Sequence, residues 1–262
     1  MNQYFDIGAN LTHPHFKNDL ESVLYNAIEE GINKISITGS NIEESVEALK
    51  MAKKWPKLLI SSCGIHPHEA KKYNYSSLSE IKDLSKNNQV CSIGETGLDY
   101  HRTYSSPKDQ KKSFEAHVEL AIELNMPLFL HVREAHDDFI AILDNARDKL
   151  PKVVVHCFTG LKTELDDYIE RNFFIGITGW ICDERRGKHL KQLINNIPIN
   201  KLLIETDSPF LLPRNSGIKH SKRNEPMYLS IIANEVARNR HEQNKDVFQR
   251  IFENSKNFFG LV

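Results

Sequence analysis

The sequence predicts an α/β protein of the (β/α)8 barrel class, the TIM barrel, and three observations support this class. Eight short apolar runs recur along the 262 residues, segments with helical spacing separate them, and polar residues stand at the ends of several runs. Barrels of this class commonly occupy about 250 residues. We therefore expect one domain that spans residues 1–262.

The eight apolar runs are the expected strands. They are brief, mostly rich in Ile, Val, Leu and Phe, and do not alternate strictly in polarity, which is typical of parallel strands buried on both faces. In chain order they are residues 4–8, 34–38, 58–63, 90–94, 127–131, 152–156, 173–177 and 201–206.

Helical spacing follows the runs, and capping residues indicate where the helices begin. Ser40, with Glu43 three residues later, predicts a capping box at the start of the second helix. Ser106 and Pro107 predict the start of another, because proline lacks only an N–H that the first helical turn does not use. The last helical pattern closes at Gly260.

A doubly wound open sheet is the competing architecture, and periodicity alone does not separate it from a barrel. In an open sheet the ligand binds where the strand order reverses, whereas a barrel gathers polar groups from many strands at one rim. Polar residues follow many of the expected strands here, which favours the barrel.

Composition narrows the class of protein. There are 34 Lys and Arg against 35 Asp and Glu, so a net charge of −1 provides no overall basic field for nucleic acid. The cysteines lie far apart and form no C-x-x-C pair, which predicts reduced, buried thiols. The N-terminus does not resemble a signal peptide, and no apolar run has the length of a membrane span. We expect a cytoplasmic monomer.

Four ionisable residues stand at or just past the ends of separate expected strands: Glu95, His131, His156 and Asp207. A single histidine at a strand end is more often structural than a ligand. Four such groups at one rim would be costly to bury without a cation, and imidazole and carboxylate groups are ligands of divalent metals. The pattern predicts a metal site.

Further polar residues follow the third and fifth strands. His66 suits phosphate binding or proton transfer near neutral pH, whereas loop packing is an equal alternative for His68. Arg133 could bind a phosphate through two hydrogen bonds, and a salt bridge with Glu134 or Asp137 is its alternative.

The loops after strands seven and eight combine basic and aromatic residues. Trp180, with Tyr100 and Phe158 from other loops, offers flat faces on which unpaired bases could stack. The basic residues after strand eight are Arg214, Lys219, His220, Lys222 and Arg223. Solvated charged loops are the alternative for these residues. His117, near Phe114 on the apolar side of its helix, predicts structural packing.

Several ordered motifs resemble the TatD family of metal-dependent deoxyribonucleases. They include GIHPH at 64–68, GETGLDY at 94–100, HCFTG at 156–160 and ETDSPFLLP at 205–213, and the likeness spans the chain. The resemblance implies a metallo-dependent hydrolase barrel that cleaves nucleic-acid phosphodiesters. It also implies metal-ligand roles for Glu95, His131, His156 and Asp207, with His66 as a further site residue.

One motif departs from the family. Many relatives carry Asp-x-His-x-His on strand one, whereas this chain has Gly8 and Asn10 at the histidine positions. That departure resembles the branch of 3'-5' exonucleases acting on single-stranded DNA and RNA. Two fewer imidazoles leave a more oxygen-rich ligand set, so we expect Mg²⁺, with Mn²⁺ and Zn²⁺ as alternatives.

Two other functions stay open from the sequence. The same barrel and metal could serve a metal-dependent esterase acting on aminoacyl-tRNA, whose substrate also presents an RNA 3' end. A non-catalytic protein that binds nucleic acid on this scaffold is the second alternative. The intact set of four expected ligands favours an enzyme.

Overall fold

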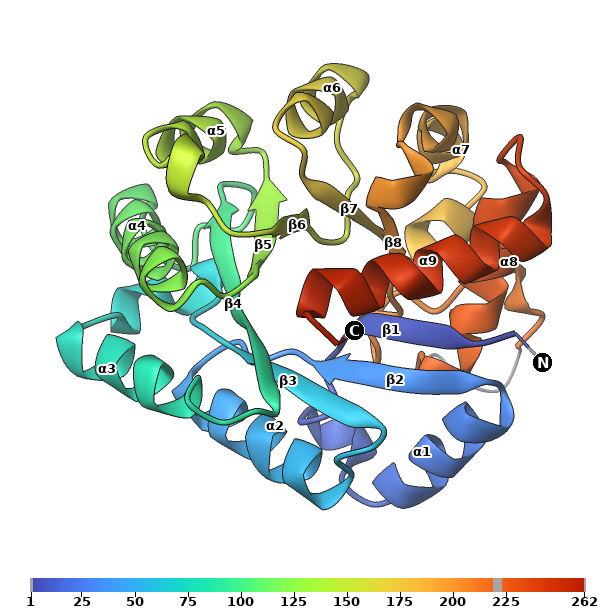
Figure 1. Ribbon diagram of the computed structural model, residues 1–262, viewed down its shortest axis with the longest axis horizontal. Helices are drawn as coiled ribbons and strands as arrows, with labels where there is room; N and C mark the ends of the chain where they lie inside the picture. The colour runs from blue at the N-terminus through green and yellow to red at the C-terminus, as the bar shows by residue number, and fades with distance from the viewer. Residues whose placement is uncertain (1, 219–222, 262) are drawn as a thin grey trace. The chain divides into compact units, whose positions relative to one another are not determined.

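The computed structural model describes residues 2–218 and 223–261, and it confirms the predicted (β/α)8 barrel class. The strands follow one another through the sheet in sequence order (Figure 1). They are β1 Tyr4–Ala9, β2 Ile32–Ile37, β3 Leu59–Cys63, β4 Val90–Asp99, β5 Leu128–Arg133, β6 Val153–Val155, β7 Phe174–Ile177 and β8 Leu202–Ile204.

A helix follows each strand, as predicted. The helices are α1 Leu20–Glu29, α2 Ile42–Lys54, α3 Tyr75–Leu84, α4 Pro107–Leu124, α5 His136–Asp144, α6 Lys162–Glu170, α7 Lys188–Leu193, α8 Leu229–Arg238 and α9 Asn244–Phe259. Short 3-10 helices lie in the connections, among them η2 Pro67–Lys72 and η4 Gly179–Cys182.

All eight predicted strands are present, and β4 and β5 extend furthest beyond their predicted ends. β4 continues to Asp99 and β5 to Arg133, because the two strands stay paired from Gly97 with His131 to Asp99 with Arg133. Glu95 and His131 therefore lie within strands rather than at their ends. β6 stops at Val155, which places His156 directly after the strand.

The chain forms two compact units. The terminal unit comprises Met1–Ile37 and Cys157–Val262, and the central unit comprises Thr38–His156. In the central unit β3 to β6 pair in parallel, and α2 and α4 pack on β3 and β4 (Figure 1). The stacked rings of Phe114 and Phe139, 5.3 Å apart, join α4 to α5.

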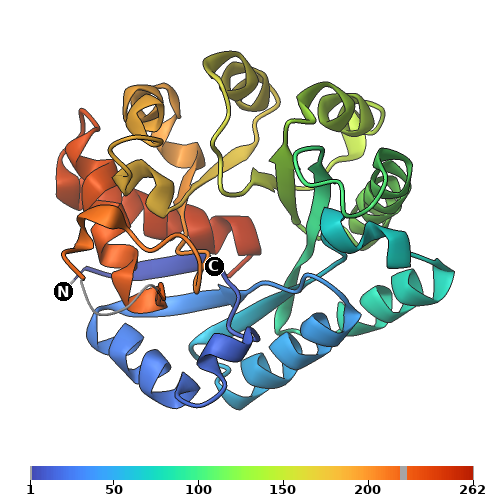
Figure 2. The same cartoon turned by 180° about the vertical axis from the view of Figure 1, so that it is seen from behind.

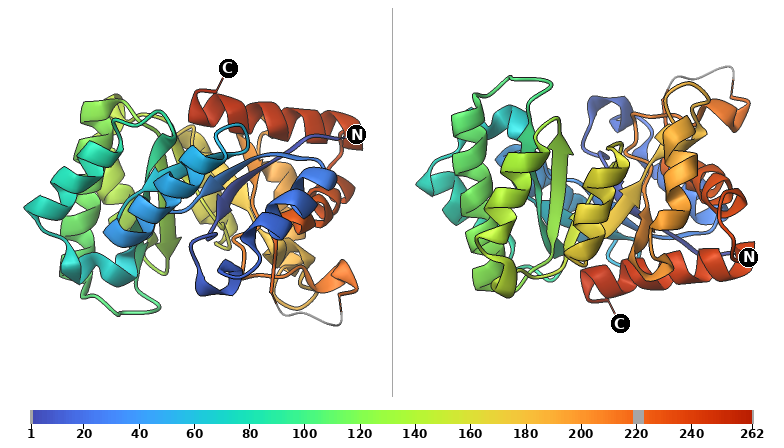
Figure 3. Two further views of the ribbon diagram at one scale, coloured as in Figure 1. Left: turned by 90° about the horizontal axis from the view of Figure 1, so that it is seen from below. Right: turned by 90° about the horizontal axis from the view of Figure 1, so that it is seen from above.

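In the terminal unit α9 packs along β1 and β8 (Figure 3). Phe5 of β1 stacks on Phe259 with ring centres 5.2 Å apart, and Phe174 of β7 meets Phe258 at 5.5 Å. These aromatic contacts anchor the last helix to the sheet. α9 ends at Gly260, as predicted, and Gly260 adopts the left-handed conformation.

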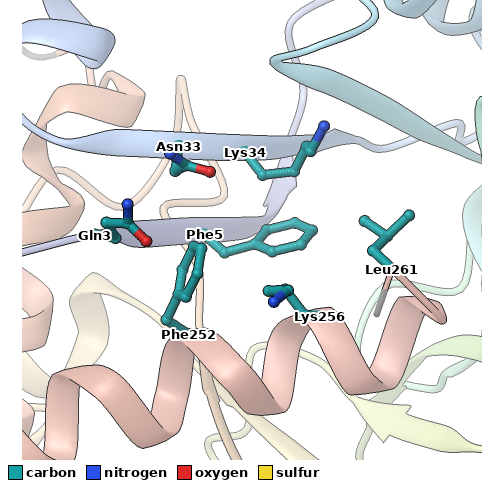
Figure 4. A pocket seen from close by; sticks show the side chains of 7 residues that line it. All are labelled: Gln3, Phe5, Asn33, Lys34, Phe252, Lys256 and Leu261. Atoms are coloured by element: carbon teal, nitrogen blue, oxygen red, sulfur yellow. The ribbon is translucent and has the colours of Figure 1, made fainter.

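A pocket of the terminal unit lies at the starts of β1 and β2, beside α9 (Figure 4). Its lining residues are Gln3, Phe5, Asn33, Lys34, Phe252, Lys256 and Leu261. None of these side chains is an imidazole or a carboxylate, and the pocket is at the amino-terminal ends of its strands. Since barrel enzymes carry their chemistry at the carboxyl ends, this pocket is not the metal site.

Of the two predicted helix caps, the one of α4 is confirmed and the one of α2 is wrong. Ser106 caps α4 and Pro107 is its first residue, as predicted. Ser40 does not cap α2: Asn41 does, and its side-chain oxygen accepts a hydrogen bond from the backbone N–H of Glu44 at 2.9 Å. The carbonyl of Ser40 instead accepts the N–H of His66, so this residue belongs to the strand-end connection.

The four cysteines are free thiols, as predicted. Cys63, Cys91 and Cys182 are buried and Cys157 is half-buried, and burial raises the pKa of Cys63 to about 12. Among the described helices, none has both the length and the apolar character needed to cross a bilayer.

Replacing Asn41 by alanine is expected to lower the free energy of unfolding by about 1 kcal/mol, because the Glu44 N–H loses its capping partner. Ser40→Ala is the matched control and should change it much less. Urea unfolding of the two variants checks this. Equal losses in both would contradict the assignment of Asn41 as the cap.

Candidate metal centre

The central unit brings three imidazoles to one buried carboxylate oxygen. Oε1 of Glu95 lies 3.1 Å from Nε2 of His66, 3.1 Å from Nδ1 of His131 and 2.9 Å from Nε2 of His156. Glu95 is 5% exposed. The predicted grouping of Glu95, His131 and His156 is therefore present, and His66 joins them.

Each of the four residues lies in, or shortly after, a different strand of the central unit. Glu95 lies within β4 and His131 within β5, His156 follows β6, and His66 lies in the connection from β3 to η2. Because carboxyl ends of neighbouring parallel strands share one edge of the sheet, residues far apart in sequence meet there. The cluster is a product of strand pairing rather than of local sequence.

Two glycines let β4 approach β5 closely enough for these contacts. A Cβ atom at Gly94 would lie 2.2 Å from the carbonyl oxygen of Phe129, and one at Gly97 would lie 2.0 Å from that of His131. Both glycines also have φ angles, +140° and +136°, that other residues rarely adopt. Glycine is required on each side of Glu95.

The charge of the carboxylate is set by its neighbours. Burial, the largest cause, would raise the pKa of Glu95, but the electrostatic effects of His66 and His156 outweigh it. Hydrogen bonds from His131 and His156 act in the same direction, and the pKa lies well below its ordinary value. Glu95 is thus an anion with three imidazole nitrogens around it.

The hydrogen bonds of His66 determine its tautomer. Its Nδ1 lies 3.0 Å from the backbone N–H of His68, and a backbone N–H can only donate. In neutral His66 the proton is therefore on Nε2, the nitrogen that faces Glu95. Burial is the largest cause of the lowered pKa of His66, which favours the neutral form. His66 is a hydrogen-bond donor toward the cluster.

His131 lies between two carboxylates. Its Nδ1 faces Glu95 and its Nε2 lies 3.3 Å from Oδ2 of Asp99. Burial would lower the pKa of His131, but the hydrogen bonds to Asp99 and Glu95 raise it overall. His68 also contacts Asp99, with Nε2 at 2.8 Å from the same oxygen. His68 therefore has a buried polar partner rather than loop packing alone.

Asp99 had no predicted role. A signal was available, because side chains two and four residues apart on a strand point to the same face. Glu95 and Asp99 are four residues apart on β4, but the predicted strand stopped at residue 94. The longer strand places both carboxylates toward the same histidine.

His117 is structural, as predicted, and supports the connection that carries His66. This wholly buried residue donates from Nδ1 to the carbonyl of Ser113 at 2.7 Å. Its Nε2 accepts the backbone N–H of Ile65, the neighbour of His66, at 3.2 Å. In Figure 2 the segment Pro67–Lys72 lies against α4, the helix of His117. Burial lowers the pKa of His117 to about 4.

Asp207, the fourth predicted ligand, lies in the terminal unit just after β8. Its backbone N–H donates to the carbonyl of Gly8 at 2.8 Å, and the side-chain amide of Asn10 donates to its Oδ1 at 2.9 Å. The N–H of Asn10 bonds the carbonyl of Ser208. Gly8 and Asn10, which replace the family histidines, thus bind and orient Asp207.

The predicted rim residues of the central unit, Arg133 and Tyr100, differ in exposure and in hydrogen bonding. Arg133 is exposed at the end of β5, and Glu134, one of its expected partners, pairs with His101 at 2.6 Å instead. Tyr100 is half-buried, and its hydroxyl donates to Asp138 at 2.7 Å. The guanidinium of Arg133 is accessible to an anion.

One of the aromatic residues predicted to stack on bases is not at the rim. Phe158 is 3% exposed and packs edge-on against Tyr168, so the prediction for this residue was wrong. Trp180 lies half-buried in η4, and the guanidinium carbon of Arg186 lies 5.5 Å from its ring centre. A base-stacking role for Trp180 stays a prediction.

Arg223 is held by carboxylates of the terminal unit. Its guanidinium donates to both oxygens of Asp19, at 3.0 and 2.8 Å, to Glu225 at 2.6 Å and to the carbonyl of His15 at 2.7 Å. These contacts favour a structural role over substrate binding. Lys219, His220 and Lys222 of the predicted basic cluster lie outside the described residues.

The donor set fits a divalent metal. Imidazole and carboxylate groups within about 3 Å of one another are the ligands such ions use. Within residues 2–218 and 223–261, His66, Glu95 and His131 offer ligand atoms close enough together to hold one ion, and His156 lies beside the same carboxylate oxygen. The fold and the cluster define a metallo-dependent hydrolase. A family model described as TatD related DNase matches residues 5–260, and the chain belongs to the TatD family.

Relatives and solved structures agree with this assignment. The 3'-5' ssDNA/RNA exonuclease TatD of Escherichia fergusonii is 43% identical over 258 residues, which are 98% of this chain and 99% of that protein. The same enzyme of Pectobacterium atrosepticum is 44% identical, over 98% of this chain and all of its own length.

Two solved structures of Escherichia coli proteins share the fold. The TatD homolog YJJV from strain k12 superposes with a TM-score of 0.90 at 25% identity over 98% of both chains. The phosphotriesterase homology protein, which has phosphate in its active site, superposes with a TM-score of 0.67 over 98% of this chain and 99% of its own. At 15% identity, the second likeness shows the fold alone.

The buried, neutral His117 is expected to make stability depend on pH. Its pKa is about 4 when folded and about 6.5 when unfolded, so the unfolded state binds the extra proton between these values. Stability is therefore full above pH 6.5 and is lost as pH falls toward 4. The wild type should lose about 2 kcal/mol more than His117→Gln between pH 7.5 and pH 5.

Urea unfolding of both proteins at the two pH values measures the difference, in which other titrating groups cancel. Glutamine can still accept the Ile65 N–H but does not titrate. If the two proteins lose the same stability on acidification, His117 is not buried in its neutral form.

Proposed function

We propose that this chain is a metal-dependent nuclease that hydrolyses phosphodiester bonds of single-stranded DNA and RNA, as a 3'-5' exonuclease. The convergence of three imidazoles on Glu95 carries the proposal, because it is the site that a metal-dependent hydrolase requires. Membership of the TatD family and relatives named 3'-5' ssDNA/RNA exonucleases support the choice of substrate. The proposal treats residues 1–262 as one catalytic barrel.

Glu95, His131, His156 and Asp207 are the proposed metal ligands. When bound, a divalent ion supplies a Lewis acid for the phosphate and lowers the pKa of a water. Glu95, His131 and His156 are included because both imidazoles lie within about 3 Å of the same oxygen of Glu95. Asp207 is included because its motif, ETDSP, matches the family, and because Gly8 and Asn10 hold it in one orientation.

The remaining residues act on the water and the phosphate. Asp207 orients the attacking water and accepts its proton, as a general base does. His66 donates its Nε2–H to a phosphate oxygen, which the tautomer set by the His68 N–H allows. Arg133, exposed at the end of β5, binds a second oxygen. Donors of this kind contribute about 2 to 4 kcal/mol each to the transition state.

Substrate contacts extend beyond the reacting phosphate. We assign His68 to the phosphate-binding side of the cluster and Trp180 to stacking with an unpaired base, which is tolerant of sequence. Arg223 takes a lesser part, because Asp19 and Glu225 already occupy its donors.

Mg²⁺ is the proposed physiological ion, with Mn²⁺ and Zn²⁺ as alternatives. Carboxylate ligands favour Mg²⁺, whereas the imidazoles of the cluster also suit Mn²⁺ and Zn²⁺. The free thiols support a reducing, cytoplasmic compartment. The monomeric state stays a prediction, and light scattering coupled to gel filtration tests it.

Purified protein with Mg²⁺ is expected to shorten 5'-labelled single-stranded DNA step by step, and EDTA should stop the reaction. Glu95→Gln should lower the rate by roughly 100-fold or more, since loss of a ligand exceeds the cost of disturbing its support. A sequencing gel with Mg²⁺, Mn²⁺ and Zn²⁺ in parallel measures this.

Glu115→Gln, an exposed change on α4, is the matched control and should keep the wild-type rate. Aminoacyl-tRNA is assayed beside DNA. Release of the amino acid without shortening of DNA would show that the protein is an esterase rather than a nuclease. If neither substrate is cleaved, the alternative of a non-catalytic binding protein is favoured.

Asn10→Ala is expected to lower kcat by roughly 10-fold, because Asp207 loses the amide that orients it for general-base catalysis. Asn10→Asp should lower it further, since two carboxylates would face each other at that contact. Single-turnover rates on labelled DNA measure the effect. Asn26→Ala, on the exposed face of α1, serves as the control. An unchanged rate for Asn10→Ala would remove this residue from the site.

A further inference from the structure

Asp99 is a buried carboxylate to which the proposed chemistry assigns no step. It is the last residue of β4 and is 1% exposed. Its Oδ2 lies 2.8 Å from Nε2 of His68 and 3.3 Å from Nε2 of His131, and its Oδ1 accepts the backbone N–H of Arg102 at 2.8 Å. Both carboxylate oxygens are therefore engaged by nitrogen donors.

A buried glutamine fixes the backbone of Asp99. The N–H of Asp99 donates to Oε1 of Gln110 at 2.8 Å, and Nε2 of Gln110 returns a hydrogen bond to the Asp99 carbonyl at 2.9 Å. The same amide nitrogen donates to the carbonyl of Ser105 at 3.0 Å. Gln110 is wholly buried on α4. The carboxylate is thus held from its backbone as well as from its side chain.

We propose that Asp99 is a positioning residue that keeps the proton of His131 on Nε2, so that Nδ1 offers its lone pair to the metal. The inference rests on the proposed function, because it takes His131 as a metal ligand. A neutral imidazole carries one proton, and an ionised carboxylate can only accept. When Nδ1 is given to the metal, that single proton is on Nε2, the nitrogen that lies 3.3 Å from Oδ2 of Asp99.

The position of His131 separates this role from direct ligation. The ring of His131 lies between Glu95, which faces its Nδ1, and Asp99, which faces its Nε2. Carboxylates placed behind a ligating histidine in this way fix its orientation and increase its basicity. Asp99 acts on the metal through His131.

The contact between Asp99 and His68 extends the effect of this carboxylate beyond His131. Through His68, Asp99 also restrains the connection that carries His66, since the N–H of His68 donates to His66. The hydroxyl of Ser105 restrains the same segment, because it donates to the carbonyl of His68 at 2.9 Å. One carboxylate therefore couples the orientation of His131 to that of the segment containing His66.

Asp99→Asn tests the proposal with Mn²⁺ alone, without nucleic acid. Asparagine keeps the shape but turns one acceptor oxygen into a donor. With its oxygen toward the Arg102 N–H, its NH₂ group faces Nε2 of His131 and displaces the proton to Nδ1. Mn²⁺ affinity, measured by electron paramagnetic resonance, should fall roughly 10- to 100-fold. Asp83→Asn, an exposed change on α3, should leave it unchanged.

Nitrogen NMR of the wild type, labelled in its histidines and saturated with Mg²⁺, gives a second measurement that needs no variant. A proton on Nε2 of His131 supports the proposal, and a proton on Nδ1 overturns it. Unchanged Mn²⁺ affinity in folded Asp99→Asn also overturns it.

Glu95→Gln separates failure of this inference from failure of the proposed function. If Glu95→Gln loses Mn²⁺ and Asp99→Asn does not, the metal centre stands and Asp99 has no positioning role. If Glu95→Gln binds Mn²⁺ as the wild type does, the metal centre itself is wrong.

Discussion

A single carboxylate oxygen, Oε1 of Glu95, is the point on which the site depends. Three imidazoles meet it, and each comes from a different segment of the central unit, so pairing of β3 to β6 must be correct to within a residue. A slip of one position in β4 would turn Glu95 to the opposite face of the strand. The buried anion is stable because the surrounding nitrogens compensate for lost hydration. The register of β3 to β6 is therefore required both by the fold and by the chemistry of the site.

The barrel was predictable from the sequence because parallel strands buried on both faces are continuous apolar runs. Strand lengths were less so. β4 and β5 continue through Glu95 and His131 to polar residues that the apolar pattern does not include, since pairing with a neighbour, rather than hydrophobicity, sustains a strand at a polar rim. For a related reason the cap of α2 is Asn41 rather than Ser40. The carbonyl of Ser40 accepts the N–H of His66, so Ser40 belongs to a contact that the local sequence does not show.

Within the site, the grouping of Glu95, His131 and His156 was predictable because imidazoles and carboxylates at several strand ends are unusual together. Their supporting contacts were not. Arg223 resembled a free rim cation, yet one of its partners, Asp19, is 204 positions away in the sequence. Phe158 follows His156 closely but turns into the core against Tyr168. Such partners depend on tertiary packing, which no local pattern encodes.

The close approach of β4 to β5 has a consequence for how the family can vary. Gly94 and Gly97 contribute no functional group, yet a single methyl at either would collide with the backbone of β5 and push Glu95 out of register with His131. Inactivating changes should therefore arise at positions with no side chain at all, and a comparison confined to ligands would overlook them. Transplanting this centre into another barrel means transferring the paired strands, glycines included, rather than four side chains.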